Sequence, residues 1–439
     1  MRTPFRSRRT VLTGGAAALV LTLTISPAAG AGTDAAPRQS GSLVLVGGGL
    51  KDDNTQVYGE IIERAGGTKA RIGVITASSV PASQDPYAGD PDKCSNSECN
   101  GEYYSKVFKR HGAADAQWIP IDLDHISNAD ADAVVRQVNS MSGFFFGGGD
   151  QSRYLTTLLN GAAHTDSKVL AAIRAKLAAG AVVAGSSAGA QITAGTDMVT
   201  GGESYEGLRD GSSPGYFEDA TRLGYEPEGG FGFLRSGLID THTGAYGREG
   251  RAMRLAADTG HDRVYALEEN TALVVEHPGG PRERVRVLGP RGVAVFDLRR
   301  ARVQGEASAR GTAGRHGTWS LSGVRYDYLT DGDRYDPRLR LTLPAAGKRP
   351  LAPLSTTPVP ANTDVFYSVA NPAGVPYSFL TTARALAATR AQRTAEATTY
   401  EDGPRFTVTF AKTPGFTTWS GDGATPQTLT GMSIVVAGR

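Results

Sequence analysis

Cysteine, histidine and long apolar runs are scarce in this chain, and these absences limit which kinds of protein it can be. The 439 residues include 2 cysteines and 7 histidines, and the net charge at pH 7 is only +2. Because this charge is so small, bulk electrostatics do not indicate a nucleic-acid partner. After residue 30, no apolar run reaches the roughly 20 residues that a membrane-spanning helix needs. The apolar content of 40% is typical of a globular protein with a substantial core.

The first 31 residues differ in sequence pattern from the rest of the chain. Arg8 and Arg9 precede an apolar run that ends at Ile25, and small residues follow at positions 28–31. This pattern predicts an export signal over residues 1–31, of the twin-arginine type rather than the general secretory type. The run is too short for a membrane anchor. We therefore expect a secreted, extracellular protein with no stable membrane association after signal cleavage.

The two cysteines, Cys94 and Cys99, lie close together in a polar segment. In an oxidising compartment this spacing predicts a local disulfide. A metal site would need two further ligands nearby, and the sequence offers none. The acidic run 331–336 lacks the full set of regularly spaced oxygen ligands of a calcium-binding loop and is interpreted as a turn. We expect no metal and no cofactor.

Buried strands alternate with helices from residue 41 onward. Strands lacking polar alternation, separated by helices, are typical of a parallel sheet covered on both faces. The sequence thus predicts an α/β fold, with a mostly parallel sheet flanked by helices. Predicted strands are 42–46, 71–75, 117–121, 143–146 and 181–184, and predicted helices are 55–65, 101–112, 130–139 and 168–179. Ligands of such sheets bind beyond the carboxyl ends of the strands.

The pattern changes after about residue 264, where short strands are joined by turns. Later come a proline-rich stretch, a predicted helix at 378–390 and alternating runs that indicate further strands. We predict an α/β domain over residues 41–340 and a separate, mostly β module over 341–439. If the module is separate, its deletion should spare hydrolysis of soluble substrates, provided that the remaining core folds.

Ser187 is the candidate nucleophile. It stands in Gly185-Ser-Ser-Ala-Gly189, directly between a predicted strand and a predicted helix. The glycines permit a sharp turn that exposes the hydroxyl, and the N-terminus of the helix offers N–H groups to a developing oxyanion. The local motif by itself fits a non-catalytic turn equally well.

A serine nucleophile needs a base and a group that orients the base. His242 follows the apolar run 237–240, and Glu268 and Glu269 follow the run 264–267. Solvated loop charge would explain these residues equally well, and spacing alone does not choose among them.

Two glycine runs also follow predicted strands. The run 147–149 lacks the lysine of a P-loop and the spacing of a dinucleotide fingerprint. We expect it to supply a backbone N–H group facing Ser187, with the run 47–49 packed beside it.

The order of these motifs resembles that of cyanophycinases and the related aspartyl dipeptidases. The resemblance rests on segments 144–151, 184–190, 240–251, 267–272 and 324–336, and it covers residues 41–337. The closing segment and the spaced arginines favour cyanophycinases over the shorter dipeptidases.

This resemblance implies an α/β serine peptidase with a catalytic triad of Ser187, His242 and Glu269. Glu268 would lie beside the catalytic glutamate. The implied oxyanion donors are the N–H groups of Ala188 and of Gly148 or Gly149. The implied substrate-binding residues are Gln151, Asp240, Arg248 and Arg251.

Cyanophycinases cleave cyanophycin, a poly-aspartate that carries arginine on each side-chain carboxyl, and release β-aspartyl-arginine dipeptides. The resemblance therefore implies a peptide or polymer substrate of this kind. Thr241 and Tyr246 stand where a glutamine and an arginine are expected. These departures motivate an alternative, a peptidase for other β-aspartyl or acidic dipeptides. A further alternative is a non-catalytic polymer-binding protein. The sequence is compatible with a homodimer but does not decide the oligomeric state.

Overall fold

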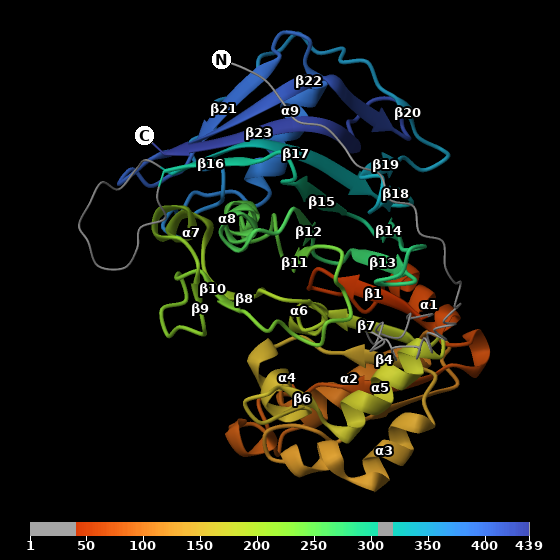
Figure 1. The fold of residues 1–439 in the computed structure, drawn as a ribbon. Helices are drawn as coiled ribbons and strands as arrows, with labels where there is room; N and C mark the ends of the chain where they lie inside the picture. The colour runs from red at the N-terminus through yellow and green to blue at the C-terminus, as the bar shows by residue number, and fades with distance from the viewer. Residues whose placement is uncertain (1–40, 306–318, 439) are drawn as a thin grey trace, which may run out of the picture. The chain divides into compact units, whose positions relative to one another are not determined.

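The computed structural model describes residues 41–305 and 319–438, arranged mainly on two nine-stranded sheets (Figure 1). The predicted export signal at 1–31 lies outside the described residues. Within the described ranges, no helix combines the length and apolar character needed to cross a bilayer.

The first sheet contains the predicted parallel core. Five neighbouring strands run parallel: β1 (Ser42–Val46), β7 (Val182–Ser186), β4 (Gly143–Phe146), β2 (Arg71–Ile75) and β3 (Asp115–Trp118). Antiparallel strands continue the sheet beyond β1: β13 (Ala272–Glu276), β14 (Arg284–Leu288), β18 (Arg334–Asp336) and β19 (Leu341–Leu343). The predicted α/β class is confirmed.

Helices cover both faces of the parallel strands, which explains why these strands are apolar throughout. Leu43 and Leu45 of β1 belong to one buried cluster, which includes α3 (Asp132–Asn139), α4 (Gln151–Leu158) and α5 (Lys168–Ala178). Val44 and Val46 belong to another, with α1 (Thr55–Arg64) and α2 (Ser97–Arg110). Successive side chains of a strand point to opposite faces, so each strand is buried on both sides.

The second sheet is mainly antiparallel, with one parallel pair at its edge. That pair is β11 (Leu238–Asp240) and β12 (Arg263–Leu267). The remaining strands are β15 (Gly292–Asp297), β17 (Ser320–Thr330), β23 (Thr428–Gly438), β22 (Phe406–Ser420), β20 (Arg349–Pro350), β16 (Arg302–Gln304) and β21 (Thr394–Thr398). Helices α8 (Glu249–Thr259) and α9 (Ser378–Ala388) contribute to the buried cluster of this sheet.

Strands from both sides of the predicted domain boundary share the second sheet. β17 pairs with β23 through Val324 opposite Ile434 and Tyr326 opposite Met432. The division at residue 340 stays a prediction, but the C-terminal region is rich in β-structure and holds one helix, α9, among its described residues.

Smaller elements complete the described chain. They are β5 (Leu159–Asn160), β6 (Thr165–Asp166), β8 (Met198–Gly201), β9 (Ser213–Pro214), β10 (Gly224–Glu226), α6 (Ala188–Gln191), α7 (Ser204–Asp210), η1 (Gly67–Lys69), η2 (Ala82–Gln84) and η3 (Ile126–Asp130).

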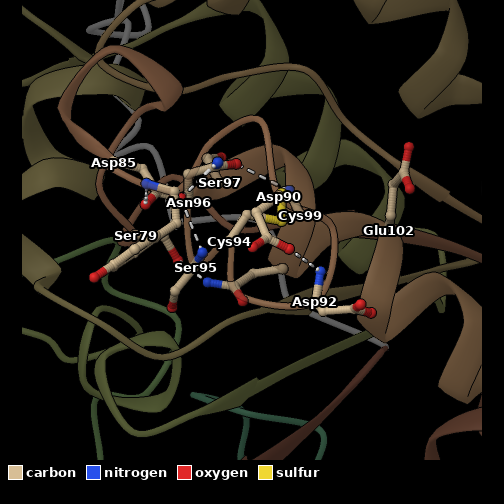
Figure 2. The surroundings of a disulfide bond; sticks show 12 residues. Ser79, Asp85, Asp90, Asp92, Cys94, Ser95, Asn96, Ser97, Cys99 and Glu102 are labelled. Atoms are coloured by element: carbon tan, nitrogen blue, oxygen red, sulfur yellow. Dashed lines mark hydrogen bonds between the residues drawn. A yellow bond between two sulfur atoms is a disulfide. The ribbon is translucent and has the colours of Figure 1, made fainter.

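The predicted disulfide between Cys94 and Cys99 is present (Figure 2). Between them, Asn96 caps α2 by accepting the N–H of Cys99 at 3.0 Å. Asp85 in turn accepts hydrogen bonds from Ser95 and Asn96, both at 2.9 Å. The cap explains why α2 begins at Ser97, earlier than the predicted residue 101.

Candidate active site

Ser187 occupies a tight turn between β7 and α6. Its backbone has φ 55° and ψ −120°, a conformation that L-residues rarely adopt. Both flanking glycines are needed for the turn, because a Cβ atom on Gly185 would lie 2.1 Å from the Gly189 carbonyl oxygen, and one on Gly189 would lie 2.0 Å from that of Phe146. The turn exposes the hydroxyl at the carboxyl end of β7, as expected for a nucleophile.

The structure brings Ser187, His242 and Glu269 together in one hydrogen-bond chain. The Ser187 Oγ atom lies 2.8 Å from His242 Nε2, and His242 Nδ1 lies 2.7 Å from Glu269 Oε1. Strands β11 and β12 are parallel neighbours, so the residues that follow them, His242 and Glu269, meet at one edge. The exposed fractions of the histidine and glutamate side chains, 14% and 31%, leave the chain reachable from solvent.

The glycine run 47–49 fixes the position of the imidazole. A Cβ atom on Gly48, where φ is +98°, would lie 2.1 Å from two ring atoms of His242. The Gly47 carbonyl accepts the N–H of His242 at 2.7 Å, and the Gly48 carbonyl accepts that of Asn270 at 2.7 Å. The run therefore packs against His242 and the loop that holds Glu269, a contact that was not predicted. The contact forms because β13 pairs with β1, which places the loop 268–271 over the end of β1.

Burial sets the protonation state of His242. It lowers the imidazole pKa below the ordinary value of 6.5; Glu269 opposes this shift and the positive charge of Arg248 adds to it. The ring is therefore mainly neutral near pH 7, as a general base must be.

The predicted oxyanion donors lie on both sides of the serine. Ala188 opens α6, where backbone N–H groups lack intrahelical partners. A Cβ atom on Gly148 would lie 3.3 Å from Ser187 Cβ, so that backbone passes beside the nucleophile. Gly149, with φ +143°, packs against the Ser78 carbonyl instead. The assignment of oxyanion donors stays a prediction.

Asp240 and Arg251 form a buried ion pair. Two guanidinium nitrogens donate to the carboxylate at 2.6 and 2.8 Å, and a third donates to the Gly202 carbonyl at 2.7 Å. Gln151 donates to the Val199 carbonyl at 3.2 Å. These polar groups are thus partnered within the protein, and their predicted contact with substrate stays a prediction.

Tyr246 lies directly against His242. Its ring stacks on the His242 ring with centroids 4.8 Å apart and planes 8° from parallel. The guanidinium of Arg248 lies 4.8 Å from the Tyr246 centroid and donates to the Thr241 carbonyl at 3.0 Å. Burial lowers the pKa of Arg248 to about 10, which leaves the group charged at neutral pH.

Comparison with known families matches residues 43–279 to the model of Peptidase family S51. The match covers more than half of the chain and includes Ser187, His242 and Glu269. The chain belongs to peptidase family S51. It is therefore a serine-type peptidase, and the predicted family is confirmed at this level.

Two solved structures are similar to this S51 peptidase at low identity. A peptidase from an acI-B1 Actinobacterium is 18% identical, and the match covers 68% of this chain and 98% of that one with a TM-score of 0.42. A putative peptidase E protein from Listeria monocytogenes EGD-e is 13% identical, with 57% and 98% covered and a TM-score of 0.34.

The second acidic residue of this peptidase, Glu268, has a different environment from Glu269. Its carboxylate is buried and accepts the N–H of Gly244 at 2.9 Å. Burial raises its pKa to about 7. Because Glu268 makes no hydrogen bond to His242 in the described structure, the geometry gives the orienting contact to Glu269 alone.

Sequence reasoning missed Ser78, which fixes the second glycine loop of the S51 peptidase. Its hydroxyl lies 3.1 Å from the Gly147 carbonyl and 2.8 Å from that of Gly148, to which it donates. The available signal was its place just after the predicted strand 71–75, at the edge where ligands bind.

Proposed function

We propose that this S51 peptidase is a secreted exopeptidase that hydrolyses the aspartate backbone of cyanophycin and releases β-aspartyl-arginine dipeptides. Ser187, His242 and Glu269 act as its triad. The observation that carries the mechanism is the continuous chain of hydrogen bonds, 2.8 and 2.7 Å long, from hydroxyl to imidazole to carboxylate.

In the proposed reaction, Ser187 Oγ attacks the peptide carbonyl while His242 Nε2 takes the hydroxyl proton. Backbone N–H groups of Ala188 and Gly148 hold the oxyanion of the tetrahedral intermediate. The intermediate collapses as His242 protonates the leaving amine, which leaves an acyl-enzyme. Water, deprotonated by His242, then releases the acid product and restores Ser187.

The substrate class rests on the ordered resemblance of the motifs to cyanophycinases. One feature of the structure supports it: Arg248, charged and close to the Tyr246 face, would pair with a substrate carboxylate beside the base. Export rests on the arginine pair and apolar run within residues 1–31.

A second candidate is a peptidase for other β-aspartyl or acidic dipeptides. Tyr246 favours it, because an aromatic ring occupies the place of an expected arginine and stacks on His242. Arg251 favours it too, because its donors are held by Asp240 and Gly202.

The test is to incubate the purified mature protein with insoluble cyanophycin and identify the products. We expect β-aspartyl-arginine, absent with Ser187→Ala and retained with Ser186→Ala, because among the described residues the hydrogen bond to His242 Nε2 comes from Ser187 and not from Ser186. Cleavage of small β-aspartyl peptides alone would favour the second candidate. Polymer binding without hydrolysis of either substrate would favour a non-catalytic protein. Hydrolysis unaffected by Ser187→Ala would refute the triad.

A further inference from the structure

A polar cavity of about 640 Å³ is lined almost entirely by residues outside the segment that matches the family. Its walls come from the loop after β14, the end of β17, and the segment that leads into α9. Apart from Gln56, every lining residue lies beyond residue 279. The volume is within the range of about 300–1,000 Å³ that is usual for small-molecule sites.

Two guanidinium groups in this cavity have no acidic partner. Within the described ranges, neither Arg291 nor Arg384 forms an ion pair or a side-chain hydrogen bond, and the Nε atom of Arg384 is buried without a partner. Lys348, the other cation of the lining, is by contrast paired with Asp333 at 2.8 Å. A buried polar group without a partner is costly, so the Nε atom of Arg384 is unusual, whereas Arg291 is exposed to solvent.

Aromatic rings hold both arginines in place. The guanidinium of Arg291 lies 4.1 Å from the centroid of Tyr377, and that of Arg384 lies 5.2 Å from the centroid of Tyr328. An arginine that stacks on a ring keeps its N–H edge free for bidentate contact with a planar anion. The arrangement is preorganised for a negatively charged ligand.

The cavity adjoins the loop that carries the base. The N–H of Tyr377 donates to the Gly244 carbonyl at 2.7 Å, two residues after His242. Glu268 lies close enough to feel the charge of both arginines, but its carboxylate accepts the Gly244 N–H and forms no ion pair with them. Both guanidinium groups therefore remain available on the cavity side.

We propose that Arg291 and Arg384 form a second binding site, for a carboxylate ligand, next to the catalytic loop. The choice of a carboxylate rests on the proposed function, because an aspartate-rich polymer and its products present this group. The ligand is either a free acidic amino acid or peptide, or a carboxylate of a polymer held at Ser187.

Calorimetry on the full mature chain carrying Ser187→Ala, with L-aspartate as the probe, tests the free-ligand source. We expect saturable binding that Arg384→Gln and Arg291→Gln each weaken about tenfold or more. The matched control is Arg390→Gln, which removes an exposed positive charge just after the same helix. Arg291 is itself exposed, so its variant remains informative if Arg384→Gln does not fold.

Kinetics on the active enzyme test the polymer source. In that case Arg384→Gln raises KM for cyanophycin about tenfold, but not KM for the shortest fragment that is hydrolysed. Three results would overturn the proposal: neither effect is seen, Arg390→Gln weakens binding equally, or inorganic phosphate binds the same arginines more tightly than L-aspartate. If cyanophycin is not hydrolysed at all, the proposed function fails while the L-aspartate titration still decides the site.

Discussion

The two large sheets contribute differently to one site. The first supplies Ser187, the proposed nucleophile, from the end of a buried parallel strand, β7, covered by helices on both faces. The second is mainly antiparallel and, in the described part of the chain, supplies the proposed base and acid, His242 and Glu269, from the ends of a parallel pair, β11 and β12. The nucleophile is thus set by local turn geometry, whereas the positions of base and acid depend on how the second sheet packs against the first.

This difference extends to the C-terminal region, which adds β20, β21, β22 and β23 to the second sheet but only the edge strand β19 to the first. If the two sheets differ in this way, removing strands of the second sheet should cost stability, whereas point changes at the contact between the sheets should damage catalysis while the parallel core stays folded.

The largest effect is expected from deleting residues 341–439. The deletion would remove β22, β23 and the Tyr377 contact with Gly244, so we now expect it to abolish hydrolysis rather than spare it. Fully buried side chains are lost, namely Val408, Phe410, Met432, Ile434 and Val436. At about 1.5–3 kcal/mol each, their loss is comparable with a typical net stability of about 5–15 kcal/mol. We expect insoluble or unfolded protein, measured by soluble yield and circular dichroism. A soluble and active truncated enzyme would instead support the prediction that residues 341–439 form a separate module.

The next largest effect is expected from Glu269→Gln. The amide would no longer stabilise the charged imidazole, so kcat should fall by roughly 10³–10⁴-fold. The matched variant is Glu268→Gln, in which the amide oxygen still accepts the Gly244 N–H, and we expect a loss of less than about tenfold. Steady-state kinetics on both proteins measures the contrast. Equal losses would mean that both glutamates orient His242.

Gly48→Ala tests the contact between the sheets. The added methyl would overlap the His242 ring, and a displacement of about 1 Å can cost roughly 100-fold in rate. We expect kcat/KM to fall by about that factor. Gly59→Ala in α1 is the control, because its Cβ would meet open space and a helical alanine is favoured by about 1 kcal/mol. That variant should keep full activity and a raised Tm. Full activity of Gly48→Ala would argue against a rigid contact.

The smallest effect concerns pH. Activity requires neutral His242, so kcat/KM should rise as the pH increases through the lowered pKa of the imidazole. Arg248 contributes to that lowering. Arg248→Gln should therefore raise the pKa and move the acidic limb of the profile to higher pH. Arg235→Gln, at an exposed position, should leave the limb in place. An unchanged limb with Arg248→Gln would mean that the charge of Arg248 does not contribute to the lowered pKa of His242.

Much of the parallel core could be predicted from sequence, and the reason is local. Strands 42–46, 71–75 and 143–146 coincide with β1, β2 and β4 because continuous apolar runs end at turn-forming residues. Helix α8 was not predicted, because its buried face includes Arg251 and Arg254. The guanidinium of Arg254 is fully buried against Trp319, at 4.5 Å from the ring. From the sequence alone, an arginine at this position would be expected on the surface of the protein.

The candidate site also combines local features that the sequence could predict with long-range contacts that it could not. Ser187, His242 and Glu269 each follow an apolar strand, so motif order could identify them. The contacts of Gly48 with His242 and of Tyr377 with Gly244 join distant parts of the chain. The local sequence pattern does not predict such contacts, because they depend on how the two sheets pack against each other.

The pairing of β1 with β13 also sets when the enzyme can first act. Val46 lies opposite Ala272, about 226 residues later in the chain. At a synthesis rate of roughly 5–20 residues per second, the partner strand emerges about 10–45 seconds after β1. Until then, the loop with Glu269 cannot dock beside Gly48, and the second sheet still lacks β22 and β23. If the proposed triad is right, a chain still being synthesised has Ser187 long before Glu269 is docked, which delays hydrolysis until the second sheet can form.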